Sequence, residues 1–338
     1  INKRTNTHGA MRNCIEYVLR QDKTSEQLTY VTGPYCHDEI NYDLVYRAFL
    51  EENGFCTPRA RGYSSVEEAK KDLENFKFPV MVKPVDSAGS KGVARMDDAG
   101  QLEELVENAL QYSRCKRFII EEYVEKYRYQ IAGDGFSVDG KLVFRCFANE
   151  HFSNKAASPY VPIGESFPYD MPKEVHEKVH AEIQRLLTLL DMKTQAYNFD
   201  IRIDKDYNVY LMEVGPRNGG NMIAQVIEKA TGIPFVEYML KAAMGEDCSE
   251  LKMVEPEGFW SCYILHTLKE GNFKRIQYTD EIKKNIVEEH IHVKEGEKLI
   301  PFTGSNGTVG VLILRYDSME EMLHKMDNMY DYITVEVE

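Results

Sequence analysis

Two carboxylates, an arginine and an asparagine lie close together in the stretch Ala196–Asn221. Asp200 and Glu213 fall on the two arms of a predicted β-hairpin, and Arg217 and Asn218 follow within a few residues. Mg²⁺ prefers oxygen ligands and usually takes one or two carboxylates together with the phosphates of a substrate. The stretch therefore predicts a Mg²⁺ seat, with a solvated polar face of the hairpin as the alternative.

The predicted seat depends on the register of the hairpin. If Asp204 pairs with Val209 across a four-residue loop, Asp200 lies opposite Glu213. The apolar face would then consist of Phe199, Ile201, Ile203, Tyr210, Met212 and Val214. A slip of one residue would separate the two carboxylates.

A second stretch, residues 78–93, has the composition of a phosphate-binding loop. An apolar run ends at Lys83, and a small, flexible segment with Gly89 and Gly92 follows, where backbone N–H groups can approach a phosphate closely. The residue order of a Walker loop is missing, so this loop belongs to another architecture. Lys91 either touches phosphate or keeps an exposed loop soluble, and both readings stay open.

A third stretch, residues 117–124, reads as a buried strand that ends in Glu121 and Glu122, where a peptide hinge can offer backbone groups to a purine edge. These three pieces, in this order, resemble the ATP-grasp superfamily. More narrowly, the chain resembles its carbamoyl-phosphate-synthetase-like and amino-acid-ligase branch over residues 42–338.

The resemblance implies an α+β fold in which two lobes hold ATP, followed by a small C-terminal α/β subdomain. It places Asp200 and Glu213 on Mg²⁺ or Mn²⁺, Arg217 near the transferred phosphoryl group, and Asn218 as a substitute for an asparagine that the family carries at the position of Gly215. It makes Lys83 and Arg217 the catalytic residues. The nucleotide-binding residues that it implies are Lys83, Ser87, Gly89, Ser90, Lys91, Gly92, Glu121, Glu122, Tyr123 and Val124.

In the resembled ligases, the loop at residues 151–168 lines the acceptor-substrate pocket. His151 is a candidate there, although a solvent-exposed connection is an open alternative. A predicted helix starts at Gly219-Gly220, where free N–H groups can receive a carboxylate, or where the glycines only turn the chain. The substrate candidates are Lys155, Ser158, Arg202, Gly219 and Gly220.

The first part of the chain departs from this pattern. Residues 9–52 resemble the N-terminal segment of conjugative mobilisation relaxases, with Tyr17 near that family's nucleophile, but no histidine cluster follows. We interpret residues 1–41 as a fusion scar and expect the usual Rossmann-like half-domain to be absent. Further departures at Asp43, Arg128 and Gly215 weaken the match to an active enzyme.

Local patterns predict further elements and a domain order. Ser65 and Glu68 form a capping-box pattern, Asp139-Gly140 is a hairpin signal, and residues 174–190 have the period of an amphipathic helix. We expect a first lobe at 42–124, a second lobe at 125–250 and a C-terminal subdomain at 251–338, after the fragment 1–41.

Composition limits the function classes. A net charge of −14 over 338 residues argues against a general binder of nucleic acid or anionic membranes. Seven scattered cysteines without a C-x-x-C pair argue against a disulfide framework, and no apolar run reaches the length of a membrane span. We expect a cytoplasmic protein without a membrane or nucleic-acid partner.

The resemblance therefore predicts an ATP- and Mg²⁺-dependent carboxylate–amine ligase that works through an acyl phosphate. Its partners would be a small carboxylic acid and an amine or amino acid, with a homodimer or a second protein supplying the missing half-domain. A truncated, catalytically impaired nucleotide-binding module is the main alternative, and a DNA relaxase is the third.

Overall fold

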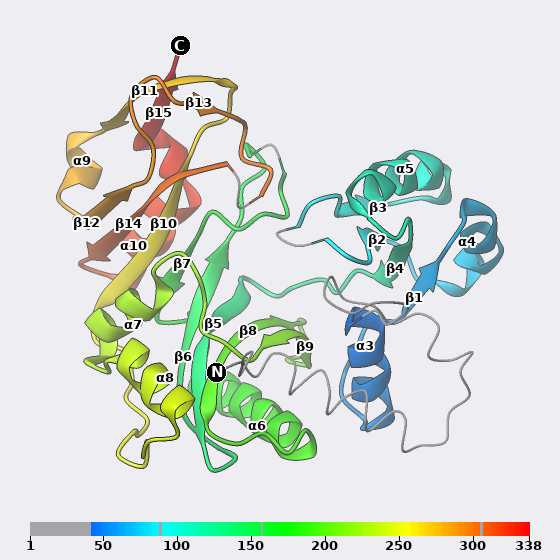
Figure 1. Cartoon of the computed structure of the whole chain (residues 1–338), viewed down its shortest axis with the longest axis horizontal. Coiled ribbons are helices and arrows are strands. Elements are labelled where there is room, and N and C mark those ends of the chain that lie inside the picture. The colour runs from blue at the N-terminus through cyan, green and yellow to red at the C-terminus, as the bar shows by residue number, and fades with distance from the viewer. Residues whose placement is uncertain (1–41, 88–89, 157, 305–306) are drawn as a thin grey trace. The chain divides into compact units, whose positions relative to one another are not determined.

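The computed structural model describes residues 42–87, 90–156, 158–304 and 307–338 (Figure 1). The described chain divides into two compact units. The first unit contains residues 42–126 and 204–210, and the second contains residues 127–203 and 211–338. The predicted fragment 1–41, with Tyr17, and the predicted nucleotide-binding residue Gly89 lie outside the described residues.

The first unit is built on a four-stranded antiparallel sheet with the strand order β1-β4-β2-β3. Its strands are β1 (Ala60–Tyr63), β2 (Val80–Pro84), β3 (Ala94–Met96) and β4 (Phe118–Glu122). Its helices are α3 (Tyr42–Glu52), α4 (Val66–Asp72), η1 (Leu73–Asn75), η2 (Ala99–Gln101) and α5 (Leu102–Tyr112).

The helices of the first unit begin where the sequence supplies caps. Ser65 accepts a hydrogen bond from the backbone N–H of Glu68, which confirms the predicted start of a helix there. Asp98 and Gln101 form a complete capping box ahead of α5. Helix α5 then buries Val106 among the apolar side chains of β2 and β4.

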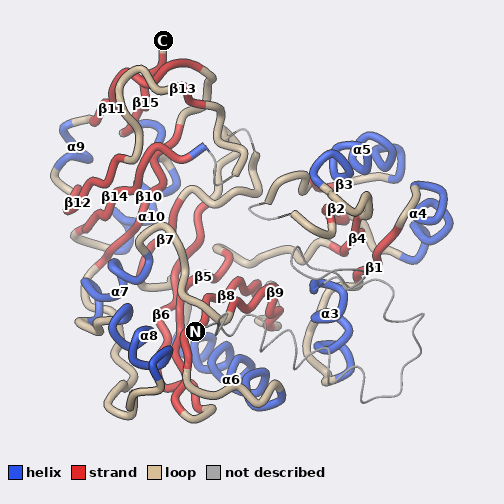
Figure 2. The backbone as a smooth tube through the Cα atoms, viewed as in Figure 1, coloured by secondary structure: helices blue, strands red, loops and turns tan. Residues whose placement is uncertain are grey.

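The second unit is built on an eight-stranded sheet with the order β12-β14-β10-β7-β6-β5-β8-β9 (Figure 2). Its strands are β5 (Gln130–Val138), β6 (Lys141–His151), β7 (Gly164–Phe167), β8 (Gln195–Ile203), β9 (Val209–Gly215), β10 (Phe259–His266), β12 (Ile286–Ile291) and β14 (Thr308–Tyr316). The C-terminal strands β10, β12 and β14 thus extend the sheet begun by β5–β9.

A smaller sheet of order β13-β11-β15 completes the second unit, and Figure 1 shows it near the C-terminus. Its strands are β11 (Gly271–Tyr278), β13 (Lys298–Leu299) and β15 (Ile333–Val337). The helices of this unit are α6 (Lys173–Leu189), α7 (Ile223–Thr231), α8 (Phe235–Met244), α9 (Asp280–Lys283), α10 (Met319–Asp327) and η4 (Met329–Asp331).

Two local predictions for the second unit are confirmed. Asp139 and Gly140 both have positive φ angles, 50° and 82°, and they connect β5 to β6 in a tight hairpin. Helix α6 buries one stripe at helical spacing, and that stripe faces the sheet beside β6. The buried residues of α6 are Val175, Val179, Ile183, Leu186 and Leu187.

The predicted register of the β8–β9 hairpin is wrong at its turn. The N–H of Asp204 bonds to the carbonyl of Asn208 at 3.3 Å, one residue before the predicted partner Val209. Val209 and Leu211 are consequently buried, whereas Tyr210 and Met212, predicted on the apolar face, are partly exposed. The alternation of buried and more exposed residues is interrupted at Glu213, so Val214 is buried, as predicted.

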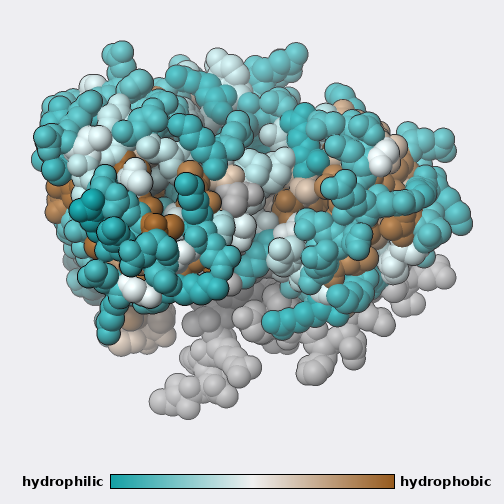
Figure 3. All heavy atoms as spheres, turned by 90° about the horizontal axis from the view of Figure 1, so that it is seen from above, coloured by the Kyte–Doolittle hydropathy of each residue, from teal (hydrophilic) through white to brown (hydrophobic). Residues whose placement is uncertain are grey.

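The apolar side chains of the second unit form two cores. One packs α7 and α8 against the middle of the large sheet, and the other joins α10 to the small sheet and to β10 and β14. Hydrophilic side chains predominate on the face shown in Figure 3, with apolar ones in scattered groups. None of the helices in the described part of the chain has both the length and the apolar character of a membrane span.

Candidate functional site

In the first unit, Lys83 forms an ion pair with a buried carboxylate. Lys83 Nζ lies 2.5 Å from Glu121 Oε1, and Arg47 Nε donates to Glu121 Oε2 at 2.8 Å. Burial alone would raise the pKa of Glu121, but Arg47 and Lys83 outweigh it and hold that pKa at about 2. Glu121 therefore stays ionised and orients the ammonium group of Lys83, which is 19% exposed.

The loop after β2 packs closely against helix α5 at Gly92. Gly92 has a φ of +74°, and a Cβ atom there would lie 2.8 Å from the ring of Tyr112. Ser90 also has a positive φ angle of 58°. Asp86 fixes the base of the loop by accepting hydrogen bonds from the backbone N–H groups of Arg114 and Cys115. These contacts fix the loop, in which Gly92 is buried, and the phosphate-binding roles of Ser87, Ser90, Lys91 and Gly92 stay predictions.

Two backbone N–H groups of the predicted purine hinge already form hydrogen bonds within the first unit. The N–H of Glu122 bonds to the carbonyl of Arg59 at 2.9 Å, and the N–H of Tyr123 bonds to the carbonyl of Pro79 at 3.0 Å. The carboxylate of Glu122 accepts from the N–H of Lys77. A purine at this hinge would therefore have to be read by other backbone groups of the segment.

In the second unit, four acidic side chains gather on adjacent strands of the large sheet, and we call them the carboxyl cluster. Asp134 lies on β5, Glu150 on β6, Glu165 on β7 and Asp200 on β8. Glu150 and Glu165 are direct cross-strand partners. Like charges in that position repel each other and destabilise a sheet, so the cluster needs a compensating charge.

Burial raises the pKa values of three of these carboxyl groups. The pKa of Asp200 rises to about 8, through burial and then the charge of Glu150, while Arg217 and Arg202 oppose the rise. The pKa of Asp134 rises to about 7. Burial, followed by Glu150, Asp134 and Asp200, raises the pKa of Glu165 well above its usual value. The positive charge nearby is too small to compensate the negative charge of four ionised carboxylates.

Arg217, exposed on the chain after β9, supplies part of that positive charge. It lowers the pKa values of Asp134, Glu165 and Asp200, and its Nη1 atom donates to the backbone carbonyl of Asn218 at 2.7 Å. The predicted catalytic residue Arg217 and the predicted metal ligand Asp200 are thus in electrostatic contact within one unit.

The helix start predicted at Gly219-Gly220 is wrong, and the substrate role of Gly220 stays a prediction. Helix α7 begins at Ile223, and the N–H of Gly219 is already bonded to both carboxylate oxygens of Asp134, at 2.8 and 2.9 Å. Asn198 also donates to Asp134, at 3.0 Å. The chain's own carboxylate therefore occupies the N–H group that was expected to receive a substrate. The space around Gly219 is tight, because a Cβ atom there would lie 2.7 Å from the end of the Ile223 side chain.

Arg202, a predicted substrate residue, is engaged inside the sheet. Its Nε donates to Gln130 at 2.8 Å, and Gln130 donates to Glu150 at 2.7 Å. The arginine thereby reaches the carboxyl cluster through an amide. This arrangement positions Glu150. It also occupies one N–H donor of Arg202, so fewer donors of this side chain can bind an external ligand.

Glu165 gives the clearest indication of what the carboxyl cluster receives. Its Oε2 atom is buried and has no hydrogen-bond partner among the described residues. A buried polar atom without a partner costs free energy, and a cation or an ammonium group would supply the missing contact. Within the described ranges, no three His, Cys, Asp or Glu side chains are grouped to hold a metal ion by themselves. Mg²⁺ needs only one or two carboxylates when phosphates complete its shell, so the cluster fits Mg²⁺ bound with a nucleotide.

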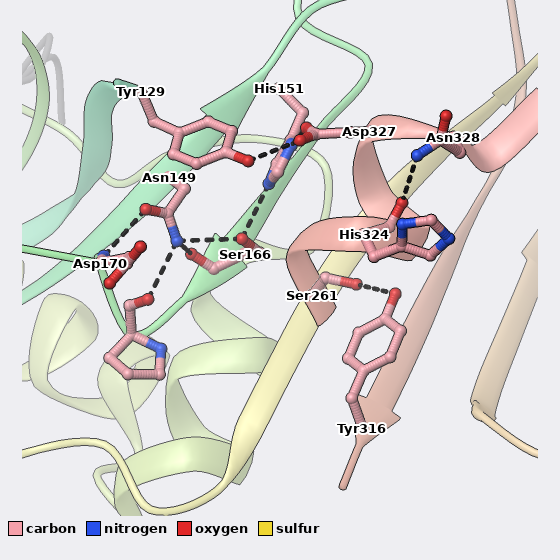
Figure 4. A network of polar contacts seen from close by, with 11 residues as sticks. Tyr129, Asn149, His151, Ser166, Asp170, Ser261, Tyr316, His324, Asp327 and Asn328 are labelled. Carbon is pink, nitrogen blue, oxygen red and sulfur yellow. Dashed lines mark hydrogen bonds and ion pairs between the residues drawn. The ribbon is translucent and has the colours of Figure 1, made fainter. Parts of the chain in front are cut away.

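His151, a predicted pocket residue, is instead buried in a polar network of the second unit (Figure 4). Its Nδ1 lies 2.8 Å from Asp327 at the end of α10, and its Nε2 lies 2.8 Å from the hydroxyl of Ser166. Tyr129 donates to the other oxygen of Asp327 at 2.6 Å. The order Ser-His-Asp is that of a hydrolase triad. However, Ser166 is fully buried and also accepts from Asn149, so it cannot reach a substrate and the network is structural.

The contacts of the remaining predicted residues do not test their roles. Lys155 lies 3.3 Å from Asp331, and Ser158 accepts a backbone hydrogen bond from Val161. Glu213 is exposed on β9, and the side chain of Asn218 donates to the carbonyl of Gly219. Their roles as metal or substrate ligands stay predictions.

The sequence interpretation missed Asp134, Glu150, Glu165 and Asn198. A usable signal was present, because each of the three acids interrupts a strand that is otherwise buried, as in the segments QIAGDGFSV and KLVFRCFANEH. Acidic side chains are rarely buried unless they are paired or functional.

Comparisons with known proteins agree with this architecture. Residues 47–251 match the family model described as the carbamoyl-phosphate synthase L chain, ATP binding domain. The N-terminal section of the carbamoyl phosphate synthase large chain of Methanopyrus kandleri is 28% identical over 216 residues, which cover 61% of this chain and 36% of that protein. The corresponding C-terminal section of Aquifex aeolicus is 25% identical over 65% of this chain and 40% of that protein. The chain thus spans well under half the length of these relatives.

Two solved structures share the fold. The L-amino acid ligase of Bacillus licheniformis superimposes with a TM-score of 0.69 and 22% identity, over 88% of this chain and 72% of that chain. The biotin carboxylase domain of the 2-oxoglutarate carboxylase of Hydrogenobacter thermophilus gives a TM-score of 0.67 and 15% identity, over 97% of this chain and 73% of that chain. The predicted α+β ATP-grasp fold is therefore confirmed, and the chain belongs to the ATP-grasp family of the carbamoyl-phosphate synthase L chain ATP-binding domain.

Proposed function

We propose that this protein is an ATP- and Mg²⁺-dependent carboxylate–amine ligase that works through an acyl phosphate. The carboxyl cluster beside Arg217 is the observation that carries the proposal. It provides negative charge that is not compensated by the fold, within a chain whose family model is an ATP-binding domain. Such a site suits a metal-bound nucleotide and an ammonium substrate.

The chain's own residues would contribute charge and position. Lys83, oriented by Glu121, would bind phosphate oxygens, and Ser87, Ser90, Lys91 and Gly92 would surround them. Bound Mg²⁺ would neutralise phosphate charge. Arg217 would stabilise the negative charge that develops when the substrate carboxylate attacks the γ-phosphoryl group of ATP and ADP leaves. No side-chain nucleophile is needed for this phosphoryl transfer.

The second half-reaction needs an uncharged amine. An amine enters the site mostly as an ammonium ion, and Glu165 Oε2 offers a buried acceptor for one of its N–H groups. Because the pKa of Glu165 is raised well above its usual value, the ionised form of this carboxylate readily takes the proton. The neutral amine can then attack the acyl phosphate, which releases phosphate and leaves an amide.

The proposal is tested with a matrix of carboxylic acids and amines, with ADP release as the readout and hydroxylamine as a trap for the acyl phosphate. We expect acid-dependent hydroxamate formation by the wild type and a loss of at least about a hundredfold in Arg217→Met. Arg185→Met on the surface of α6 is the matched control and should retain activity. ATP binding without any acid-dependent ADP release would instead support a nucleotide-binding module without turnover.

The oligomeric state belongs to the same proposal. The solved biotin carboxylase domain is described as a dimer, and we propose a homodimer for this chain as well. Light scattering of the full chain at micromolar concentration distinguishes a dimer from a monomer.

A further inference from the structure

A cavity of about 520 Å³ lies in the second unit, among residues of β10, β11, β15 and the segment that follows β10. None of its lining residues belongs to the carboxyl cluster or to the predicted nucleotide site. Its size falls within the range of small-molecule pockets, which runs from about 300 to 1,000 Å³. Its walls combine aromatic rings, aliphatic side chains and cations.

One wall is held rigid by His266. Its Nδ1 donates to the carbonyl of Ile264 at 2.6 Å, so its Nε2 accepts the hydroxyl proton of Tyr330, also at 2.6 Å. Burial lowers the pKa of His266 to about 4, which keeps the ring neutral and in this tautomer. Its ring stacks on Phe302 with centroids 4.4 Å apart. The aromatic wall is therefore preorganised, which reduces the entropic cost of binding a flat ligand.

The same wall also contains a phenol group. Tyr263 lines the cavity and is 2% exposed, and its ring lies 5.8 Å from that of His266, measured between centroids. A phenol hydroxyl can donate a hydrogen bond to a ligand oxygen.

The rim of the cavity is positively charged. Three cationic side chains and one carboxylate line it, and the carboxylate of Glu336 is paired with Arg275 at 2.7 Å. Lys269 and Lys274 form no ion pair with described residues. This excess of two positive charges stands out in a chain with a net charge of −14.

A strand irregularity places one of these lysines at the cavity. The pairing of β11 with β15 shifts register between Phe273 and Arg275. In a regular strand, Lys274 and Arg275 would point to opposite faces. At the bulge both line the cavity, and bulges commonly redirect side chains in this way.

We propose that this cavity is a second binding site for a small organic anion with a flat, apolar body. The lysines would hold the anionic group, the hydroxyl of Tyr263 would donate to it, and the aromatic wall with Leu268 and Val335 would cover the apolar body. None of the residues that line the cavity belongs to the carboxyl cluster, so the ligand of this site would be a molecule other than the reacting acid.

The test uses two fluorescent probes that differ mainly in charge, 1-anilinonaphthalene-8-sulfonate and its uncharged counterpart N-phenyl-1-naphthylamine. Both are titrated into the full chain. We expect the sulfonate to bind the double variant Lys269→Gln/Lys274→Gln about tenfold more weakly than the wild type, and the neutral probe to bind both equally. Thr334→Trp, at an exposed position that lines the cavity, should fill the space and abolish binding of both probes.

The control is Lys284→Gln/Lys294→Gln, which removes the same charge from two exposed lysines outside the cavity. Its affinity for both probes should stay within about twofold of the wild type. Sulfonate affinity that is unchanged in Lys269→Gln/Lys274→Gln overturns the assignment of an anion site. Probe binding that survives Thr334→Trp, or that the wild type lacks, overturns the cavity as the binding site.

Discussion

Buried carboxyl groups have lowered pKa values in the first unit and raised pKa values in the second. In the first unit, Glu121 is fully paired by Arg47 and Lys83, and its pKa is held at about 2. In the second unit, burial raises the pKa values of Asp134, Glu165 and Asp200, and neighbouring carboxylates add to the rise at Glu165 and Asp200. The charge of Glu121 is already compensated by two cationic side chains, so this carboxylate positions its partners. The carboxyl cluster has less positive charge around it, so it can accept a cation. For this reason we propose cation binding in the second unit and not at Glu121.

The opposite shifts predict opposite pH dependences. Glu121 has a depressed pKa, so its contribution to stability is present above its ordinary value of 4.5 and is lost as the pH falls towards 2. Asp200 has a raised pKa, so its contribution is present below its ordinary value of 3.8 and is lost as the pH rises through about 8.

The largest effect is expected from Arg47→Met. This change leaves a buried carboxylate with one partner instead of two, and breaking a buried ion pair commonly costs about 3–5 kcal/mol of unfolding free energy. Urea unfolding at neutral pH measures the loss. A loss below about 1 kcal/mol would show that Glu121 is not held as described.

A smaller effect of the opposite sign is expected from Asp200→Asn. Without Mg²⁺ near pH 8, we expect this variant to be about 1–2 kcal/mol more stable than the wild type, because it removes one charge from the carboxyl cluster. Near pH 4 the difference should vanish. Asp206→Asn, in the exposed turn between β8 and β9, is the control and should show no such pH dependence. A variant that is less stable at both pH values contradicts the charge argument.

Mg²⁺ should stabilise the wild type by an amount that grows with pH. The cation competes with protons for the carboxyl cluster, so its affinity should rise between about pH 6 and pH 8 as Asp134 and Asp200 lose their protons. At ten times the dissociation constant the gain is about 1.4 kcal/mol. Thermal unfolding with and without Mg²⁺ measures it. An equal gain in Asp200→Asn would place the metal elsewhere.

The smallest effect is expected at an exposed ion pair. Lys70 and Glu103 lie 2.5 Å apart, but their side chains are 53% and 72% exposed. Lys70→Met should therefore leave the midpoint of urea unfolding unchanged within the error of the measurement. This variant serves as the matched comparison for Arg47→Met, and a similar cost for the two would contradict the role assigned to burial.

Much of the fold was predictable from local pattern. The order of the Lys83 loop, the Glu121 strand and the hairpin of Asp200 identified the ATP-grasp fold, and the spacing of apolar residues identified α6. These features depend on neighbours in the sequence, where periodicity and turn chemistry are informative. The turn at Asp139-Gly140 is another example.

The site was less predictable, because its contacts join distant segments. Arg47 and Glu121 are 74 residues apart, and Glu150 meets Glu165 only because β7 pairs with β6. The hairpin turn of β8 and β9 differs by one residue from the predicted register, which local alternation does not determine. The occupation of the Gly219 N–H by Asp134 likewise required the sheet order.

The most direct test of the account is a calorimetric titration of ATP into the full chain, with and without Mg²⁺, for the wild type and Asp200→Asn. We predict Mg²⁺-dependent binding of ATP by the wild type and a loss of at least about tenfold in Asp200→Asn, a variant that should remain folded. ATP binding that is equally strong in both proteins and indifferent to Mg²⁺ would contradict the assignment of the carboxyl cluster as the cation site.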